Sequence, residues 1–217
     1  MFTGIIERTG TITHIERKGE GAVFEIATDW PPSSYQIGES IAVNGICLTV
    51  VHFEADGQGS RFRIDASPET VQRTTMPDWR LGRRVNLERP LSLSNLLGGH
   101  LVTGHIDGCG RVVRIEEEEG PMPGRIVTLE IPPELARYMI FKGSVAVDGV
   151  SLTVHACDAS TLALNLVPHT LEVTTFGTCR VGDRMNIEVD IIGKYVEKFL
   201  HWLTPEDLER LRRERSE

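Results

Sequence analysis

Two stretches of the sequence decide the fold: SIAVNGICLTV at residues 40–50 and SVAVDGVSLTV at residues 144–154. Seven of their eleven residues are identical, at an offset of 104. In each stretch, β-prone runs flank a central dipeptide, which is Asn44-Gly45 in the first and Asp148-Gly149 in the second. Both dipeptides favour a type I′ turn, because that turn needs positive φ at its two central residues. The sequence therefore predicts the same β-hairpin twice.

The duplication extends to both sides of the hairpins. MFTGIIERTGTITHIE at residues 1–16 aligns with LVTGHIDGCGRVVRIE at residues 101–116, at an offset of 100. The offset is 100 again where Asn86-Leu87-Glu88 matches Asn186-Ile187-Glu188. A longer loop at 117–124 in the second copy and an insertion at 54–60 in the first explain the shift between these blocks. The chain is therefore predicted to be a tandem repeat of one domain of about a hundred residues.

Within each copy the pattern is all-β. Short β-prone runs at residues 10–15, 23–27, 62–65 and 85–88 lie between turns rich in Gly, Pro and Asp. About six strands per copy suit a small closed barrel, which leaves no exposed sheet edge. We expect two tandem six-stranded antiparallel Greek-key β-barrels, at residues 1–97 and 98–193.

The tail at residues 194–217 differs from both copies. Tyr195, Val196, Phe199, Leu200 and Leu203 recur at helical spacing. The run Thr-Pro-Glu-Asp at 204–207 then has the order of an N-cap, a proline at N1 and an acidic first turn. The tail is predicted to be an amphipathic C-terminal α-helix that serves in oligomerisation.

The composition excludes several classes of function. The 217 residues are 40% hydrophobic and 25% charged, and the net charge of −8 argues against nonspecific binding to nucleic acid. No apolar run approaches the ~18–20 residues that span a bilayer, so no membrane association is expected. The N-terminus lacks the features of a signal peptide, and the four cysteines form no CxxC pair. Reduced thiols and a cytoplasmic location are expected.

The motif MFTGII, the two hairpins and GGHLVTGHIDG at residues 98–108 together resemble the riboflavin synthase family of the trimeric α-subunit type. The resemblance covers residues 1–203. It implies a transferase of riboflavin biosynthesis with two lumazine-binding barrels. In its reaction one molecule of 6,7-dimethyl-8-ribityllumazine donates a four-carbon unit to a second, giving riboflavin and 5-amino-6-(ribitylamino)uracil. Neither a metal nor a cofactor is implied.

The resemblance also implies an assembly and a set of site residues. The assembly is a homotrimer whose active site, holding two lumazines, lies between the N-terminal barrel of one subunit and the C-terminal barrel of the next. Lumazine synthase is expected as a further partner. The family positions for one lumazine match Gly4, Ile5, Ile6, Cys47, Leu48, Thr49, Asp65, Ala66, Ser67, Pro68, Glu69 and Thr70. Those for the other match Gly104, His105, Ile106, Ser151, Leu152, Thr153, Asn165, Leu166, Val167, Pro168, His169 and Thr170, and Lys142 reaches a lumazine on the neighbouring subunit.

Comparing the two copies separates binding from catalysis. Positions that are the same should hold what two identical substrates share, and positions that differ should make one substrate the donor and the other the acceptor. The differing pairs are Ile5/His105, Asn44/Asp148, Cys47/Ser151 and Glu69/His169. Histidine carries protons near neutral pH, and Cys and Ser are candidate nucleophiles. The candidate catalytic residues are therefore His105, Cys47, Ser151 and Asp148, to which the family match adds His100.

Other interpretations stay open at this point. Cys47 in an apolar hairpin and Asp148 in a turn also have purely structural explanations. The spacing of His100, His105 and Cys109 is no standard zinc pattern, so no metal is expected. A non-catalytic lumazine- or flavin-binding antenna protein is the main alternative, and a plain flavin-binding or scaffold barrel is another. Because the second copy keeps Gly104-His105-Ile106 and Ser151-Leu152-Thr153, the sequence favours the enzyme; it does not say which barrel holds the donor.

Overall fold

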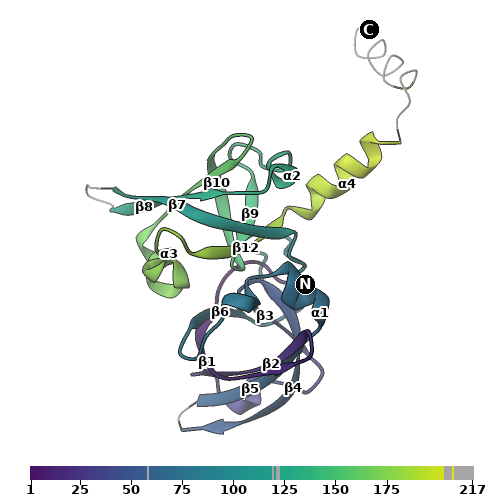
Figure 1. The fold of residues 1–217 in the computed structure, drawn as a ribbon, viewed down its shortest axis with the longest axis vertical. Coiled ribbons are helices and arrows are strands. Elements are labelled where there is room, and N and C mark those ends of the chain that lie inside the picture. Colours follow the sequence, from purple (N-terminus) through teal and green to yellow (C-terminus); the bar gives the residue numbers. More distant parts are fainter. Residues whose placement is uncertain (58, 119, 121–122, 203–206, 208–217) are drawn as a thin grey trace.

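The computed structural model describes residues 1–57, 59–118, 120, 123–202 and 207. In this part of the chain twelve strands form two closed antiparallel barrels, one above the other in Figure 1. The first barrel consists of β1 (Arg8–Lys18), β2 (Gly21–Thr28), β3 (Ser40–Val43), β4 (Ile46–Asp56), β5 (Gly59–Ala66) and β6 (Arg84–Glu88). The second consists of β7 (Gly108–Glu118), β8 (Gly124–Glu130), β9 (Ser144–Val147), β10 (Val150–Cys157), β11 (Thr161–Leu166) and β12 (Arg184–Val189).

Both barrels have the same strand order. In the first it is β1-β2-β5-β4-β3-β6, and β7-β8-β11-β10-β9-β12 repeats it in the second. Each β-hairpin predicted from the central dipeptides is present, with φ of 46° and 78° at Asn44 and Gly45 and of 44° and 81° at Asp148 and Gly149. The all-β fold of two six-stranded barrels is therefore confirmed.

Irregularities in the long strands help the barrels to close. The register shifts between Ile12 and His14 in β1 and between Val112 and Arg114 in β7. Equivalent shifts occur in β4 and β10. Bulges of this kind bend a strand and increase its twist, which a small barrel needs. Each barrel encloses its own core, with Phe24 packed edge-on against Trp79 in the first and Phe176 fully buried in the second.

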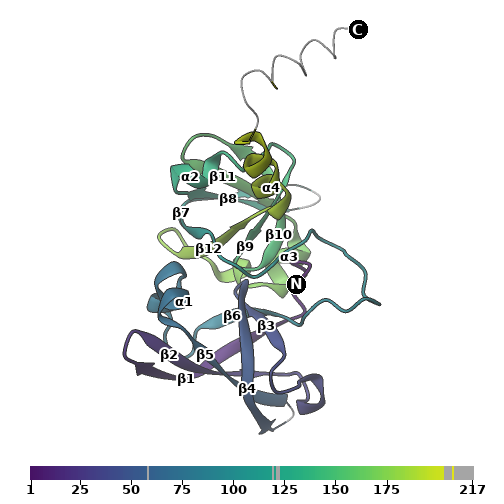
Figure 2. The ribbon, with the colours of Figure 1, turned by 90° about the vertical axis from the view of Figure 1, so that its right-hand side faces the viewer.

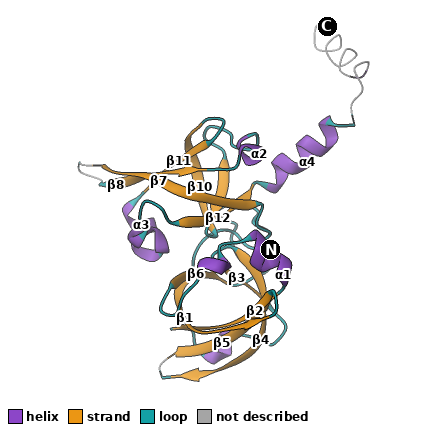
Figure 3. Cartoon of the chain, viewed as in Figure 1, coloured by secondary structure: helices purple, strands orange, loops and turns teal. Residues whose placement is uncertain are grey.

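Several short helices were not predicted from the sequence (Figure 3). They are α1 (Pro68–Arg73), α2 (Pro133–Ala136) and α3 (Pro168–Val173), with 3₁₀ turns η1 (Pro32–Ser34), η2 (Met76–Asp78) and η3 (Thr175–Thr178). Helix α1 begins where the Ser67 hydroxyl accepts a hydrogen bond from Thr70 N, with Pro68 at the first helical position. Pro168, which is equivalent to Pro68, stands at the start of α3. These helices follow β5 and β11, and α1 carries part of the site described below.

The C-terminal helix α4 spans Ile191–Leu200 and begins three residues before the predicted start. It starts earlier because the Asp190 carboxylate caps it by accepting a hydrogen bond from Ile192 N. The remainder of the predicted helix, from residue 203 onward, lies outside the described residues except for Asp207. Figures 1 and 2 show α4 extending from the second barrel away from the first. None of the described helices is long and apolar enough to cross a membrane.

The two barrels meet through reciprocal hydrogen bonds. Asn86 Nδ2 donates to the Asp148 carbonyl over 2.9 Å, and Asn186 Nδ2 donates to the Asn44 carbonyl over the same distance. The side-chain oxygens of Asn86 and Asn186 in turn accept the backbone N–H groups of Thr175 and Thr75. All four side chains at the centre of this contact are buried. Exchanging the repeats exchanges the bonds, so the barrels are related by an approximate two-fold axis.

Candidate functional site

One buried glutamate anchors the start of each repeat. Glu88, at the end of β6, accepts hydrogen bonds from Thr3 N at 2.6 Å, from the Thr3 hydroxyl at 2.7 Å and from Gly4 N at 3.0 Å. Burial raises the pKa of Glu88, and these three bonds oppose the effect. Glu188, at the end of β12, accepts the equivalent bonds from Thr103 and Gly104 at 2.7–2.8 Å. The Thr-Gly segments are thus fixed by the barrels of their own repeats.

Each segment then lies against the hairpin of the other repeat. Cys47 N donates to the Gly104 carbonyl at 2.9 Å, and Ser151 N donates to the Gly4 carbonyl at 2.8 Å. Ile106 packs on the core of the first barrel, whereas Ile6 packs on the core of the second. The contact is close: a Cβ on Gly104 would lie 2.5 Å from the Cys47 Cβ, and φ there is +82°.

Because each segment contacts the hairpin of the other repeat, the grouping of residues expected from the sequence is corrected. Gly4, Ile5 and Ile6 were placed with Cys47, and Gly104, His105 and Ile106 with Ser151. In the structure residues 104–106 lie beside Cys47, and Gly4 lies beside Ser151. The reason is the approximate two-fold axis, which brings the starting segment of each repeat across the barrel interface.

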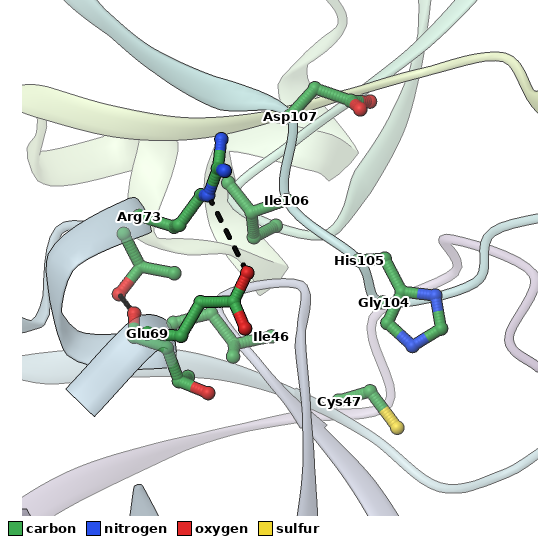
Figure 4. A pocket seen from close by; sticks show the side chains of 10 residues that line it. Ile46, Cys47, Glu69, Arg73, Gly104, His105, Ile106 and Asp107 are labelled. Atoms are coloured by element: carbon green, nitrogen blue, oxygen red, sulfur yellow. Dashed lines mark hydrogen bonds and ion pairs between the residues drawn. The ribbon is translucent and has the colours of Figure 1, made fainter. Parts of the chain in front are cut away.

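A pocket of about 380 Å³ lies where residues 104–107 face the first barrel. Figure 4 shows His105 and Cys47 on one side of it and helix α1, with Glu69 and Arg73, on the other. Glu69 and Arg73 form an exposed ion pair, with 3.8 Å between Oε1 and Nε. The full lining is Ile46, Cys47, Glu69, Thr70, Arg73, Thr74, Gly104, His105, Ile106 and Asp107. Two isoleucines, several charged groups and an exposed imidazole together suit a small polar heterocycle.

The equivalent position beside Ser151 is occupied differently. The Ser151 hydroxyl is 2.7 Å from His100 Nδ1, and His100 is buried. His100 follows Gly98 and Gly99 in the linker between the repeats, and a Cβ on Gly99 would lie 2.8 Å from the Ser151 Cβ. Burial lowers the pKa of His100, with a smaller opposing effect from Asp190, so a neutral imidazole faces the hydroxyl at pH 7. Nε2 of His100 is buried and has no hydrogen-bond partner in the described part of the chain.

Asp148, one of the candidate catalytic residues, does not line the pocket beside Cys47. Its carboxylate accepts a hydrogen bond from Asn186 N at 2.8 Å, in the interface between the barrels. Burial raises its pKa to about 7. The Asn44 side chain makes the same bond to Asn86 N in the first repeat. The structure therefore gives Asp148 a place in the barrel contact.

The other predicted site residues divide by side-chain exposure. Leu48, Ala66, Leu152 and Leu166 point into the barrel cores, where only their backbone groups can face a ligand. Lys142 is exposed and stacks on the Phe141 ring, outside the pocket. The remaining members with exposed side chains are Ile5, Thr49, Asp65, Ser67, Pro68, Thr153, Asn165, Val167, Pro168 and His169.

Comparison with known proteins agrees with the fold and with the repeat. The model of the lumazine binding domain family matches residues 3–90 and 103–190. A riboflavin synthase of Bacillus subtilis (strain 168) is 42% identical over 201 residues, which are 93% of this chain and 90% of the relative. A riboflavin synthase of Mycobacterium tuberculosis (strain ATCC 25618 / H37Rv) is 43% identical over 204 residues, covering 92% and 98% of the two chains.

The chain belongs to the riboflavin synthase family. Solved structures support the family's fold as well. LumP complexed with 6,7-dimethyl-8-(1'-D-ribityl) lumazine superposes with a TM-score of 0.75 at 26% identity, covering 87% of this chain and 99% of LumP. LumP complexed with riboflavin gives a TM-score of 0.76 at 28% identity, with the same coverage.

Sequence reasoning missed several residues that shape the site. Glu88 and Glu188 stand at equivalent positions in the repeat, and an acidic residue kept at the end of the same β-prone run in both copies was the signal that could have found them. Arg73 and Asp107 line the pocket although neither was a candidate. Burial raises the pKa of the Cys109 thiol to about 11. All four cysteines are free thiols.

Proposed function

We propose that this member of the riboflavin synthase family converts two molecules of 6,7-dimethyl-8-ribityllumazine into riboflavin and 5-amino-6-(ribitylamino)uracil. One observation carries the proposal. Each repeat holds its Thr-Gly segment on a buried glutamate and presents it to the hairpin of the other repeat, which gives two equivalent sites. The sites share a backbone frame but differ in side chains, as two identical substrates with unlike roles require.

The exchanged arrangement supports the following assignment of the two sites. The first combines Cys47 and Glu69 with His105, and the second combines Ser151 with Ile5 and the linker residue His100. The reaction needs a proton removed from the C7 methyl of one lumazine and an addition at C7 of the other. An exposed imidazole beside a thiol and a neutral imidazole beside a hydroxyl are unlike acid–base pairs. We assign the difference between donor and acceptor to them.

We also propose that the active form is a homotrimer, in which the first site of one subunit faces the second site of the next. Helix α4 is the candidate contact, because its apolar side chains are more than half exposed: Tyr195 59%, Val196 51% and Phe199 59%. A chain exposing this surface is expected to bury it in assembly. The reaction is expected in the cytoplasm, with lumazine synthase as a further partner that would supply the substrate.

The antenna alternative receives less support. It needs one binding site and no turnover, whereas the described part of the chain keeps the segment, the glutamate and the hairpin in both repeats. The curated relatives with 40–43% identity are named riboflavin synthase, and the LumP structures match at 26–28%.

The test is to incubate the purified protein with the lumazine alone, after dialysis against EDTA. We expect flavin absorbance to appear, with one riboflavin and one diaminouracil formed for each two lumazines consumed. Binding of the lumazine without any flavin would support the antenna alternative. Activity that disappears on chelation and returns with one added metal would contradict the metal-free reaction.

A further inference from the structure

A carboxylate anchors the segment that follows each Thr-Gly pair. In the first repeat this is Glu7, whose Oε1 accepts a hydrogen bond from Arg89 N at 2.9 Å. Its Oε2 accepts two bonds from the guanidinium of the same Arg89, from Nε at 2.9 Å and from Nη2 at 2.7 Å. Two guanidinium bonds to one carboxylate oxygen and a backbone bond to the other fix the position and the orientation of the carboxylate together. The first segment is thus held by a residue that directly follows β6 of its own barrel.

The second repeat uses the same anchor with a different cation. Asp107 stands where Glu7 does, and its Oδ2 accepts a hydrogen bond from Val189 N at 2.9 Å. Val189 corresponds to Arg89 and carries no charge. The cation comes from helix α4 instead, with Lys194 Nζ 2.6 Å from Asp107 Oδ1. The two side chains are only 28% and 21% exposed, so this ion pair is less screened than a surface pair.

Asp107 is also part of the pocket beside Cys47, two residues after His105. Its backbone N–H donates to the Ile187 carbonyl at 2.9 Å, so the main chain and the side chain are both fixed at this point. Among the contacts that fix it in the described part of the chain, the one from Lys194 comes from outside the barrel.

We infer that Lys194 is a positioning residue: from helix α4 it holds the Asp107 carboxylate and thereby sets the wall of the pocket that carries His105. The inference rests on the proposed function, since that pocket is taken to bind one lumazine. It adds that the second repeat has exchanged a local arginine for a lysine on the helix. The geometry of this pocket therefore depends on how α4 is seated, whereas the site beside Ser151 depends on Arg89.

The test replaces Lys194 with glutamine, which removes the charge but keeps a polar side chain. A lost charge-assisted hydrogen bond of this kind lowers kcat/KM by about tenfold, with a rise in KM for the lumazine. Lys194→Arg should restore most of the activity. Lys198→Gln is the matched control, because Lys198 lies on the same helix, is exposed and stacks on Trp202, away from Asp107.

A double variant shows whether the two residues act together. Asp107→Asn should reduce kcat/KM as Lys194→Gln does, and combining the two should give little further loss. Equal losses in Lys194→Gln and Lys198→Gln, or losses that multiply in the double variant, would overturn the inference. Lumazine titration by fluorescence gives the same comparison of affinities if the wild-type protein binds the lumazine without converting it. In that case the proposed function fails, but the measured affinities of the variants still test the inference about Lys194.

Discussion

At the scale of single residues, the two central turns differ in one side chain, which is an amide at Asn44 and a carboxyl at Asp148. Asn44 and Asp148 both offer a side-chain oxygen to the backbone N–H of an asparagine in the barrel interface. Asp148 is 2% exposed, and burial raises its pKa to about 7. The folded protein therefore takes up a proton at Asp148 between its ordinary pKa of 3.8 and about 7, and the unfolded chain does not. The contribution of Asp148 to the free energy of unfolding should therefore fall as the pH rises through that window.

Asp148→Asn should remove this dependence, because asparagine keeps the hydrogen bond and carries no charge. The variant is expected to exceed the wild type in free energy of unfolding by up to about 4 kcal/mol at pH 8 and to match it near pH 4. Urea denaturation at several pH values measures the difference. A variant less stable than the wild type at pH 8 would show that the carboxylate has a favourable partner. Activity measured alongside shows whether the carboxylate also serves the reaction.

A second prediction at this scale concerns the difference between the sites. Because His105 lies with Cys47 and not with Ser151, the variant that makes the sites alike is Cys47→Ser combined with His105→Ile. It should still bind lumazine but should lose at least about a hundredfold in turnover, as expected when acid–base groups are removed. Single-turnover kinetics beside equilibrium titration separate the two effects. Turnover at the wild-type rate would mean that the roles are set by how the sites face each other.

At the scale of elements, helix α4 has two distinct faces. Lys194 and Glu197 bond to the second barrel, to Asp107 and Arg137, while Phe199 and Val196 stay about half exposed. The first face fixes the helix on its own subunit, so the second face is available for assembly. Truncation after Gly193 would remove both faces together, and point substitutions are therefore the sharper experiment.

Val196→Asp together with Phe199→Asp should abolish the proposed trimer and leave the barrels folded. A buried, unpaired carboxylate costs several kcal/mol at an interface, which is enough to dissociate a small assembly. Light scattering gives the mass, and circular dichroism checks the fold. We expect a monomer that binds lumazine and makes no riboflavin; an unchanged trimer would exclude α4 as the assembly element.

At the scale of the whole molecule, the sequence predicted the architecture and six of the ten residues that line the pocket beside Cys47, but not how the two repeats combine there. The repeat, the type I′ turns and the two barrels follow from local patterns, because turn residues and strand periodicity act over a few positions. The pairing of Gly104 with Cys47 does not, since it depends on how one barrel docks on the other. Helix α4 was predicted three residues late because Asp190 was not recognised as its cap. Lys194 and Asp107 were missed because each looks like an ordinary surface charge.

We propose that each riboflavin forms between two unlike sites on neighbouring subunits. Subunit complementation tests this proposal. One variant loses the first site (Cys47→Ala with His105→Ala) and the other loses the second (Ser151→Ala with His100→Ala). Each alone should be inactive. Refolded as a 1:1 mixture, random cyclic trimers should recover about a quarter of wild-type activity, because about a quarter of the interfaces then combine two intact sites. Mixed trimers verified by native mass spectrometry that form no riboflavin would contradict the claim.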